Sequence, residues 1–502
     1  MTTNDVQETL AKLSAPLNPK ARDMSVILAA GHGKRIKSST SKMLHEIWGK
    51  PSAARVAEAC EGGLDAPCQI MVVGIMAGEV AQAVARRHRV TFVYQAEQNG
   101  TGHAVACALD LFNRGPNEPG GPIPGSVYVF PGDMGLLHGE AVREFKNAFD
   151  RSGYDMMVMT GLYEGPAEAN YYGRILRVPA KDENGQPAGA DEGKVIEIKE
   201  HKDILALAGD YRAELRGRGY RFSREELLNL REFNTSVYAF KGDLLRRHVG
   251  SLKTDNVQGE VYLTDLIAIF NQHGLSIGAV SPTDGTVVLG FNNKSVLREM
   301  ENLARRRVYD RLKDIITFEA PDDFFIADDV VEDLARLDRE KGALDIVIGA
   351  GARIGPGAKL NVNVKIARLA TLEGAIVLGR NVSIGENSHL SVYPNQQMVL
   401  GEGVEILAGD IIKGNLVIGD GSRIESSVNV TGSDEFPTRI GKNVLIKGTT
   451  YIFGTIIEDG VSILHSVLIR KRVERIERKD GSVQAVRFYL PLPEGIDCIT
   501  NL

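Results

Sequence analysis

The feature that most constrains this chain is a six-residue repeat in its last third. Aliphatic residues recur every six positions in three runs, at 348, 354, 360, 366, 372, 378, 384 and 390, then at 400, 406, 412, 418, 424 and 430, and finally at 440, 446 and 452. Units such as IGAGAR and IGDGSR place glycine next to the aliphatic residue, where the backbone turns a corner. The period predicts a left-handed parallel β-helix of triangular section, with about three hexads in each coil and so about six coils.

A different pattern fills the first 300 residues. Apolar runs of strand length alternate with helical segments; the runs are MSVILAA, CQIMVVGI, VTFVYQ, SVYVFPGD, DMMVMTGLY, TSVYAF and LSIGAVSP. Strands separated by helices predict an α/β domain with a Rossmann-like mixed, mostly parallel sheet that is covered on both faces. Ligands of such sheets bind beyond the carboxyl ends of the strands.

These patterns predict five regions. They are an N-terminal extension (1–23), an α/β domain (24–293), a helical connector (294–340), the β-helix (341–470) and a C-terminal β-hairpin tail (471–502). Breaks in the repeat near 391–399 and 431–439 are expected to be loops that leave the β-helix. The glycine- and proline-rich segment 114–125 is expected to be a surface loop, and 181–193 a turn between two strands.

Composition limits the possible partners and location. The net charge is -6, from 59 Lys plus Arg against 65 Asp plus Glu, which argues against binding to nucleic acid or to an anionic membrane. The four cysteines, Cys60, Cys68, Cys107 and Cys498, lack C-x-x-C spacing, so neither a disulfide framework nor a zinc site is predicted. No signal sequence or long apolar segment is found, and we expect a cytoplasmic protein.

A glycine-rich turn follows the first apolar run, in the string LAAGHGKRIKSSTSKMLHEIWGKP (28–51). Gly31 and Gly33 allow backbone N–H groups to approach phosphate oxygens, and Arg35 and Lys42 are placed to neutralise a polyphosphate. The string is not a Walker A loop, because no G-K-[ST] closes it, and Ile36 stands where a Rossmann fingerprint has its third glycine. It predicts a nucleoside triphosphate cradle of another kind.

The string resembles the signature of the sugar-phosphate nucleotidyltransferases, and among them it is most similar to the N-acetylglucosamine-1-phosphate uridyltransferase family. Seven further segments match that family in the same order: QAEQNGTGHAVACAL (95–109), PGDMGLL (131–137), YYGRI (171–175), IEIKEHKD (196–203), FNTSVYAF (233–240), NVQGEVYLTDLI (256–267) and GFNN (290–293). The resemblance implies uridylyl transfer from UTP to a sugar 1-phosphate, with N-acetylglucosamine 1-phosphate as the expected acceptor, and release of pyrophosphate.

The resemblance also implies roles for particular residues. Asp133 and Asn292 are expected to hold Mg²⁺, and Arg35 and Lys42 to stabilise the transition state and the departing pyrophosphate. The residues expected to contact the nucleotide are Leu28, Ala30, Gly31, Gly33, Gln95, Gly100 and Thr101, and those expected to contact the sugar are Gly173, Glu200 and Asn234. Three positions depart from the family pattern, because Lys34 replaces its usual threonine, Ser41 its usual proline and Pro131 its common tyrosine.

The β-helix leaves further readings open. Bifunctional relatives use this region to acetylate glucosamine 1-phosphate with acetyl-coenzyme A, by means of a histidine base in a G-H-x-T-Y-like stretch, which is absent here. His389 and His465 are the histidines that such a base would have to be. We therefore expect the β-helix to act mainly in assembly, as a homotrimer. Other readings are a glucose-1-phosphate uridylyl- or thymidylyltransferase, and a regulatory subunit, which would lack Arg35, Lys42 or Asp133.

Overall fold

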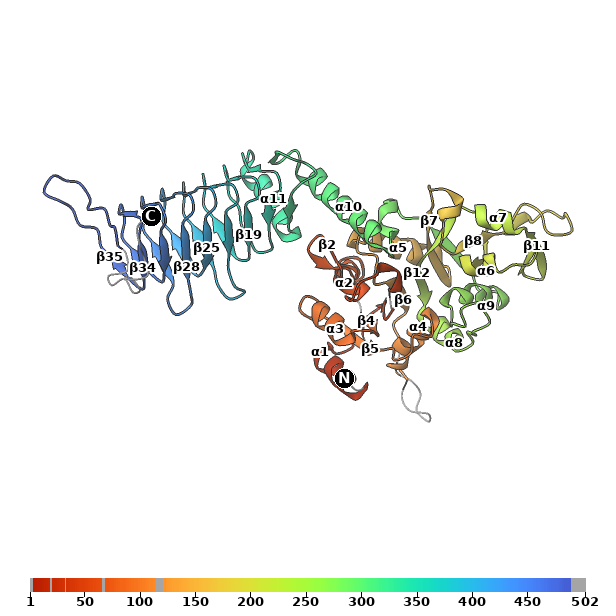
Figure 1. Ribbon diagram of the computed structural model, residues 1–502. Coiled ribbons are helices and arrows are strands. Elements are labelled where there is room, and N and C mark those ends of the chain that lie inside the picture. Colours follow the sequence, from red (N-terminus) through yellow and green to blue (C-terminus); the bar gives the residue numbers. More distant parts are fainter. Residues whose placement is uncertain are drawn as a thin grey trace, which may run out of the picture. The chain divides into compact units, whose positions relative to one another are not determined.

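The computed structural model describes residues 3–18, 20–31, 33–65, 68–113, 121 and 123–488 (Figure 1). Its contacts divide the chain into two compact units, Met1–Glu301 and Asn302–Leu502, which are described separately below. Most of the surface loop predicted at 114–125, the end of the tail predicted at 471–502, and Cys498 lie outside the described residues.

The first unit is built on a nine-stranded sheet. Seven of its strands form a continuous order: β13 (Ile277–Val280), β7 (Met156–Leu162), β12 (Glu232–Lys241), β6 (Ser126–Pro131), β1 (Asp23–Ala29), β4 (Cys68–Val73) and β5 (Thr91–Tyr94). The strands β6, β1, β4 and β5 pair in parallel, as do β13 and β7, whereas β12 runs antiparallel to both β6 and β7. The predicted mixed, mostly parallel sheet is confirmed.

Helices cover both faces of this sheet. Along β1, Ile27 and Ala29 point to one apolar core and Met24 and Val26 to the other, because successive residues of a strand face opposite ways. The first core is closed by α2 (Ser52–Gly63), α3 (Ala77–Ala85), α5 (Gly139–Ser152) and the N-terminal α1 (Thr3–Leu13). The second is closed by α4 (Thr101–Asp110), α8 (Gly242–Val249) and α9 (Leu266–Gln272).

A smaller layer extends the sheet beside β12. The antiparallel strands β8 (Arg174–Arg177) and β9 (Val195–Lys199) are joined through the turn predicted at 181–193. The hairpin of β10 (Tyr211–Leu215) and β11 (Arg218–Phe222) and the helices α6 (His201–Leu205) and α7 (Arg224–Asn229) complete this layer around its own apolar core.

The second unit is a parallel β-helix made of three sheets (Figure 1). The first contains β14 (Thr317–Phe318), β16 (Val347–Ile348), β18 (Lys365–Ile366), β21 (Ser383–Ile384), β24 (Glu405–Ile406), β27 (Arg423–Ile424), β30 (Leu445–Lys447) and β33 (Ser462–Leu464). The second contains β15 (Phe325–Ile326), β17 (Arg353–Ile354), β19 (Thr371–Glu373), β22 (His389–Ser391), β25 (Ile411–Gly414), β28 (Asn429–Gly432), β31 (Tyr451–Phe453) and β34 (Val467–Ile469). The third contains β20 (Ile376–Leu378), β23 (Met398–Leu400), β26 (Leu416–Ile418), β29 (Thr438–Ile440), β32 (Ile456–Ile457) and β35 (Arg472–Val473).

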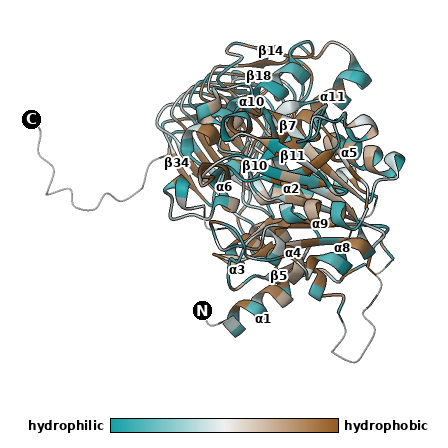
Figure 2. Cartoon of the chain, turned by 90° about the vertical axis from the view of Figure 1, so that its right-hand side faces the viewer, coloured by the Kyte–Doolittle hydropathy of each residue, from teal (hydrophilic) through white to brown (hydrophobic). Residues whose placement is uncertain are grey.

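The predicted six-residue repeat supplies the interior of these coils. Every repeat position from Ile348 to Ile452 is buried except Leu360, which is half-buried. Hydropathy colouring shows apolar residues along the strands and polar residues on the outer helices (Figure 2). The breaks in the repeat are segments without strands between β22 and β23 and between β28 and β29, as expected.

The structure extends the β-helix beyond its predicted limits. The segment predicted as a helical connector contains α10 (Lys294–Leu312) and α11 (Asp328–Lys341), but β14 and β15 lie between them and pair with the first coils. Two sheets therefore have eight strands each, more than the six coils expected. After β35, a hairpin turn at Asp480 and Gly481 brings Glu477 opposite Val483, as predicted. Among the described residues, no helix is both long and apolar enough to cross a membrane.

Candidate active site

The glycine turn after β1 brings Lys42 close to the backbone. Gly33 has φ +57°, and a Cβ added there would lie 2.8 Å from the Lys42 Cβ, so only glycine fits without a shift. Gly31 faces open space, with no atom within 4 Å of an added Cβ. Arg35 lies on the short helix η1 (Lys34–Ile36), with its side chain exposed. The turn thus offers a backbone surface and, at Arg35, an exposed cation.

Lys42 is a buried cation, with 8% of its surface exposed. It begins the short helix η2 (Lys42–Leu44), which is capped by the Ser41 side chain. Its ammonium group forms an ion pair with Asp133 and donates a hydrogen bond to Asn292 Oδ1 at 2.9 Å. The Lys42 Nζ also lies 5.3 Å from the centroid of the Phe291 ring. Three of the predicted site residues therefore meet at one point.

The side chains that meet here can be compared with those that bind a divalent metal. The Asp133 and Asn292 oxygens converge closely enough for a single cation, the Lys42 ammonium, to bridge them. Oxygen ligands of this kind suit Mg²⁺, which proteins usually bind through one or two side chains together with substrate phosphates. Within the described ranges, no group of three or more His, Cys, Asp or Glu side chains could hold a metal by itself. The pair fits a metal shared with a polyphosphate.

Gln95 lies where β5 ends and is 97% buried, with 3% of its surface exposed. Its backbone N–H donates to Val73 O at 2.8 Å, which fixes it at the carboxyl edge of β4. The turn that follows needs glycine, because Gly100 has φ +103° and an added Cβ would lie 2.4 Å from Val261 O. Thr101 begins α4, and its hydroxyl accepts a hydrogen bond from the Leu263 N–H at 3.1 Å. The predicted base-binding residues are therefore held together.

The three predicted sugar-binding residues also lie together. The Asn234 N–H donates to Gly173 O at 2.9 Å, and a Cβ on Gly173 would lie 2.9 Å from Glu200 Oε1. The Asn234 Oδ1 accepts hydrogen bonds from the Ser236 N–H and the Tyr238 hydroxyl. The Asn234 amino group makes no hydrogen bond among the described residues, so it remains able to donate to a ligand.

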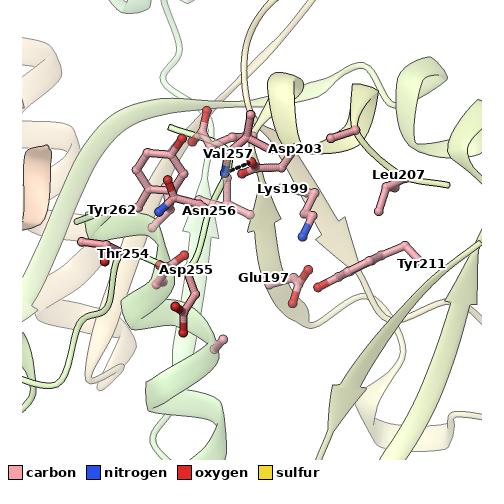
Figure 3. A pocket seen from close by; sticks show the side chains of 16 residues that line it. Glu197, Lys199, Asp203, Leu207, Tyr211, Thr254, Asp255, Asn256, Val257 and Tyr262 are labelled. Carbon is pink, nitrogen blue, oxygen red and sulfur yellow. Dashed lines mark hydrogen bonds between the residues drawn. The ribbon is translucent and has the colours of Figure 1, made fainter. Parts of the chain in front are cut away.

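Glu200 lines a cavity of about 610 Å³ between β9, α6, β10 and the segment 254–257 (Figure 3). The Glu197 and Tyr211 side chains point toward one another there, and Lys199 Nζ lies 4.1 Å from the Tyr211 ring centroid. Burial, followed by the charges of Asp203 and Asp265, raises the pKa of Glu200 to about 7. The Glu200 carboxyl therefore changes its charge near neutral pH.

Tyr172 links the group around Lys42 with the predicted sugar-binding residues. No role was predicted for it from the sequence. Burial raises the pKa of Tyr172, the Asp133 charge raises it further, and the Arg35 charge lowers it. Tyr172 thus lies within electrostatic reach of the phosphate cradle, one residue before Gly173. Its ring stacks on Phe233, with ring centroids 4.3 Å apart. The motif YYGRI contained Tyr172, but the motif alone does not tell which of its tyrosines turns toward the cradle.

Two further residues were missed although they lie in quoted motifs. Phe291 belongs to GFNN and packs beside Lys42, and His103 belongs to the segment 95–109 and contacts Gln95. Both lie against a residue that was predicted. The sequence gives no signal for either residue, because its contact with Lys42 or Gln95 exists only in the folded chain.

Comparison with known proteins gives consistent matches. A family model described as the MobA-like NTP transferase domain matches residues 25–213. A protein from Streptomyces griseus named bifunctional protein GlmU is 30% identical over 489 residues, which cover 89% of this chain and 89% of that protein. One of the same name from Clostridium acetobutylicum is 27% identical over 497 residues, which cover 94% of this chain and 97% of its own length.

One solved structure also aligns with the chain. It is that of a Bacillus anthracis protein described as a glucose-1-phosphate thymidylyltransferase, in complex with sucrose. The alignment covers 56% of this chain and 95% of the other, at 15% identity and a TM-score of 0.37. A TM-score this low supports no conclusion about this chain.

Proposed function

This chain belongs to the GlmU family of sugar-phosphate nucleotidyltransferases and transfers a uridylyl group from UTP to N-acetylglucosamine 1-phosphate; we propose that the residues around Lys42 carry out this transfer. The observation that supports the proposal is the convergence of Lys42, Asp133 and Asn292 at the carboxyl edge of the sheet, beside the glycine turn. Ligands of such sheets bind at this edge.

The reaction is a displacement at phosphorus. An oxygen of the sugar phosphate attacks the α-phosphorus of UTP, the bond to the β-phosphate oxygen breaks, and pyrophosphate leaves on the opposite side. Both reactants are anions, so the protein must hold them in line and balance their charge. No covalent link to the protein is needed.

Lys42 and Arg35 supply the positive charge in this proposal. Lys42 is buried and stands beside Asp133, which suits a contact with the α-phosphate, where negative charge grows in the transition state. Arg35 is exposed at the turn, so its guanidinium can stay in contact with the pyrophosphate as it leaves. The backbone of Gly31 and Gly33, together with Leu28 and Ala30 at the end of β1, lies against the nucleotide.

Asp133 and Asn292 are the residues that would hold Mg²⁺, as their shared bridging by one cation supports. When bound, this ion neutralises phosphate charge and orients the phosphates. Because the Lys42 ammonium pairs with the same oxygens, it would leave them with the ion in place and would then be free for the α-phosphate.

The acceptor sugar is proposed to lie against Gly173, Asn234 and Glu200. Gly173 leaves room for the Glu200 carboxylate, which accepts hydrogen bonds from sugar hydroxyls or from an N-acetyl N–H. The Asn234 amino group donates in return. Gln95, Gly100 and Thr101 are proposed to hold the base at the other end of the site.

Pyrophosphate release tests the proposed function. The full chain is assayed in magnesium buffer with UTP, dTTP and CTP, each combined with N-acetylglucosamine 1-phosphate, glucosamine 1-phosphate or glucose 1-phosphate. The expected result is fastest release with UTP and N-acetylglucosamine 1-phosphate. Release with no pair, or equal release with all pairs, contradicts the proposal.

A second activity in the β-helix remains a candidate because the relatives named bifunctional match the chain over this region as well. His389 lies on the outer side of β22, and the exposed His465 packs its ring against Gly448. In the described part of the chain, neither imidazole bonds a carboxylate that could orient a general base. Acetyl-coenzyme A consumption by the full chain with glucosamine 1-phosphate, compared with the His389→Ala and His465→Ala variants, tests this candidate.

We also propose a homotrimer that forms through the β-helix. One of its sheets exposes Ile411, Tyr451 and Ile469 on its outer surface, and apolar residues grouped on one sheet favour association. Sedimentation of the full chain at several concentrations measures the assembly. A cytoplasmic location is proposed as well, and the unbridged Cys60, Cys68 and Cys107 support it.

A further inference from the structure

The Gln95 side chain has a fixed orientation at the proposed base-binding end. Its amino group, Nε2, lies 3.2 Å from Gly100 O and 3.1 Å from His103 Nδ1. Both donor hydrogens of the amide are therefore used inside the protein. The carbonyl oxygen, Oε1, makes no hydrogen bond among the described residues, so it is the atom that Gln95 offers to a ligand.

The first of these two contacts cannot move easily. Gly100 is held against Val261, because the Val261 N–H donates to Asn99 O and the Gly102 N–H donates to Val261 O, both at 2.8 Å. An added Cβ on Gly100 would lie 2.4 Å from the same Val261 oxygen. The Gly100 carbonyl is thus a fixed acceptor. Next to it, the amino group of the Gln95 side chain is favoured over the side-chain oxygen.

The second contact comes from His103, on the first turn of α4. Because the Gln95 amino group can only donate, His103 Nδ1 accepts, and the ring proton lies on Nε2. The His103 Nε2 lies 3.6 Å from Cys107 Sγ, four residues further along the helix. The imidazole is therefore held between Gln95 and Cys107, with Nδ1 as the acceptor toward Gln95.

We propose that His103 is a positioning residue that selects the base by fixing the orientation of the Gln95 amide. The inference rests on the proposed function, since it assumes that a nucleotide base lies against Gln95. An exposed carbonyl oxygen pairs with the imino N–H of uracil or thymine. It repels cytosine, whose corresponding ring nitrogen is an acceptor, because two acceptors would then face each other.

Without the His103 acceptor, only the Gly100 carbonyl holds the amide. Rotation of the amide by 180°, which the Gly100 carbonyl then opposes by itself, would turn the Gln95 amino group toward the base and favour cytosine. A site that pairs with a ligand through a buried hydrogen bond discriminates strongly against an analogue that leaves the bond unmade. Loss of His103 should therefore change the ratio of affinities for UTP and CTP, and not merely weaken both.

The test measures binding of UTP, dTTP and CTP to the full chain by calorimetry in magnesium buffer. The wild-type chain is expected to bind UTP about 100-fold more tightly than CTP, and His103→Leu to reduce that ratio about 10-fold. The dTTP affinity should follow that of UTP. In turnover, KM for UTP should rise in His103→Leu while kcat at saturating UTP stays within about 3-fold of wild type.

Two variants complete the design. His103→Gln, which retains an acceptor, is expected to restore most of the UTP preference, and His88→Leu is the matched control, since the His88 ring bonds Glu61 rather than Gln95. If His103→Leu does not fold, His103→Ala carries the same measurement. An unchanged UTP to CTP ratio, or an equal loss for both nucleotides, overturns the inference. Failure of every nucleotide to bind the wild-type chain instead overturns the proposed function.

Discussion

Lys42 and Asn292 are 250 residues apart in the sequence, yet the Lys42 ammonium donates to the Asn292 carbonyl oxygen at 2.9 Å. The same ammonium forms an ion pair with Asp133, on a third segment. The glycine turn, the end of β6 and the loop before α10 are therefore joined at one buried cation. Because that cation and a divalent metal require the same oxygens, the two are expected to exchange when nucleotide binds.

Replacing Lys42 by alanine is expected to lower turnover at least about 100-fold, because a charge contact to the transition state is lost. The fold should remain intact, as measured by thermal unfolding. Lys50→Ala serves as the control, because Lys50 pairs with the exposed Glu58 whereas Lys42 pairs with Asp133. Wild-type turnover in Lys42→Ala would show that our role for Lys42 is wrong.

Replacing Lys42 should lower turnover but should raise the affinity for metal in the absence of nucleotide. In Lys42→Met the Asp133 carboxylate loses its internal cation, and Mn²⁺ affinity should rise about 10-fold because an unpaired, partly buried carboxylate attracts a cation strongly. Electron paramagnetic resonance of free Mn²⁺ provides the measurement. The double variant Lys42→Met, Asp133→Asn should lose this gain. Equal Mn²⁺ affinity in wild type and Lys42→Met would exclude the exchange.

The two glycines of the cradle should behave differently. Gly31→Ala meets no protein atom within 4 Å, so its free energy of unfolding should stay within about 0.5 kcal/mol of wild type while UTP binding weakens. Gly33→Ala combines a positive φ with a contact to Lys42, and should cost about 1–3 kcal/mol of stability. Urea unfolding and UTP titration separate the two. Unchanged UTP affinity in Gly31→Ala would place the phosphates elsewhere.

Glu200 should make sugar binding depend on pH. With a pKa raised to about 7, chiefly by burial, Glu200 is mostly neutral at pH 6 and mostly ionised at pH 8. The ionised carboxylate is the better acceptor, so KM for N-acetylglucosamine 1-phosphate should fall as pH rises, with an ionised fraction that grows about 10-fold over this interval. The substrate phosphate titrates in the same way with Glu200→Gln, but residue 200 no longer does. The part of the pH dependence of KM that comes from Glu200 should therefore be lost in this variant. An identical pH profile in both proteins contradicts the assignment.

Asp410 should limit the stability of the β-helix above neutral pH. It is fully buried, its Oδ1 accepts from the Val428 N–H at 2.8 Å, and its Oδ2 makes no hydrogen bond within the part of the chain that the structure describes. Burial raises its pKa from the ordinary 3.8 to about 7, so folding takes up a proton between these values and stability falls as pH rises through that window.

Asp410→Asn is therefore expected to raise the free energy of unfolding by about 2–4 kcal/mol at pH 8, and to change it little at pH 4. Denaturant unfolding of the full chain at both pH values measures the difference. Asp434→Asn, in the exposed loop between β28 and β29, is the control. Equal effects of Asp410→Asn at both pH values would show that Asp410 stays ionised.

The sequence predicted those parts of the structure that leave a local pattern. Apolar runs of strand length became β1, β4, β5, β6 and β7, and the six-residue repeat became the β-helix interior. In contrast, β14 and β15 are two residues long and lie between helices, so they have no period to detect. The hairpin of β10 and β11 was missed because its strands mix charged and apolar residues.

The same distinction applies to the site. Lys42, Asp133 and Asn292 were predicted from motifs, and the structure brings all three together. The contact between Gln95 and His103 depends on the rotation of α4 about its axis, because His103 lies on the first turn of that helix. Such rotation is a property of the packed structure and is not readable from spacing.

In the first sheet of the β-helix, the inward residues Ile348, Ile366, Ile384, Ile406, Ile424, Ile446 and Ile463 stack one above the other. Each coil pairs only with the coil before and the coil after it, so insertions at a corner project outward and leave the stack in register. The segments between β22 and β23 and between β28 and β29 are two such insertions. The second unit can therefore vary in length by whole turns, and in the loops at its corners, without any change to the residues of the first.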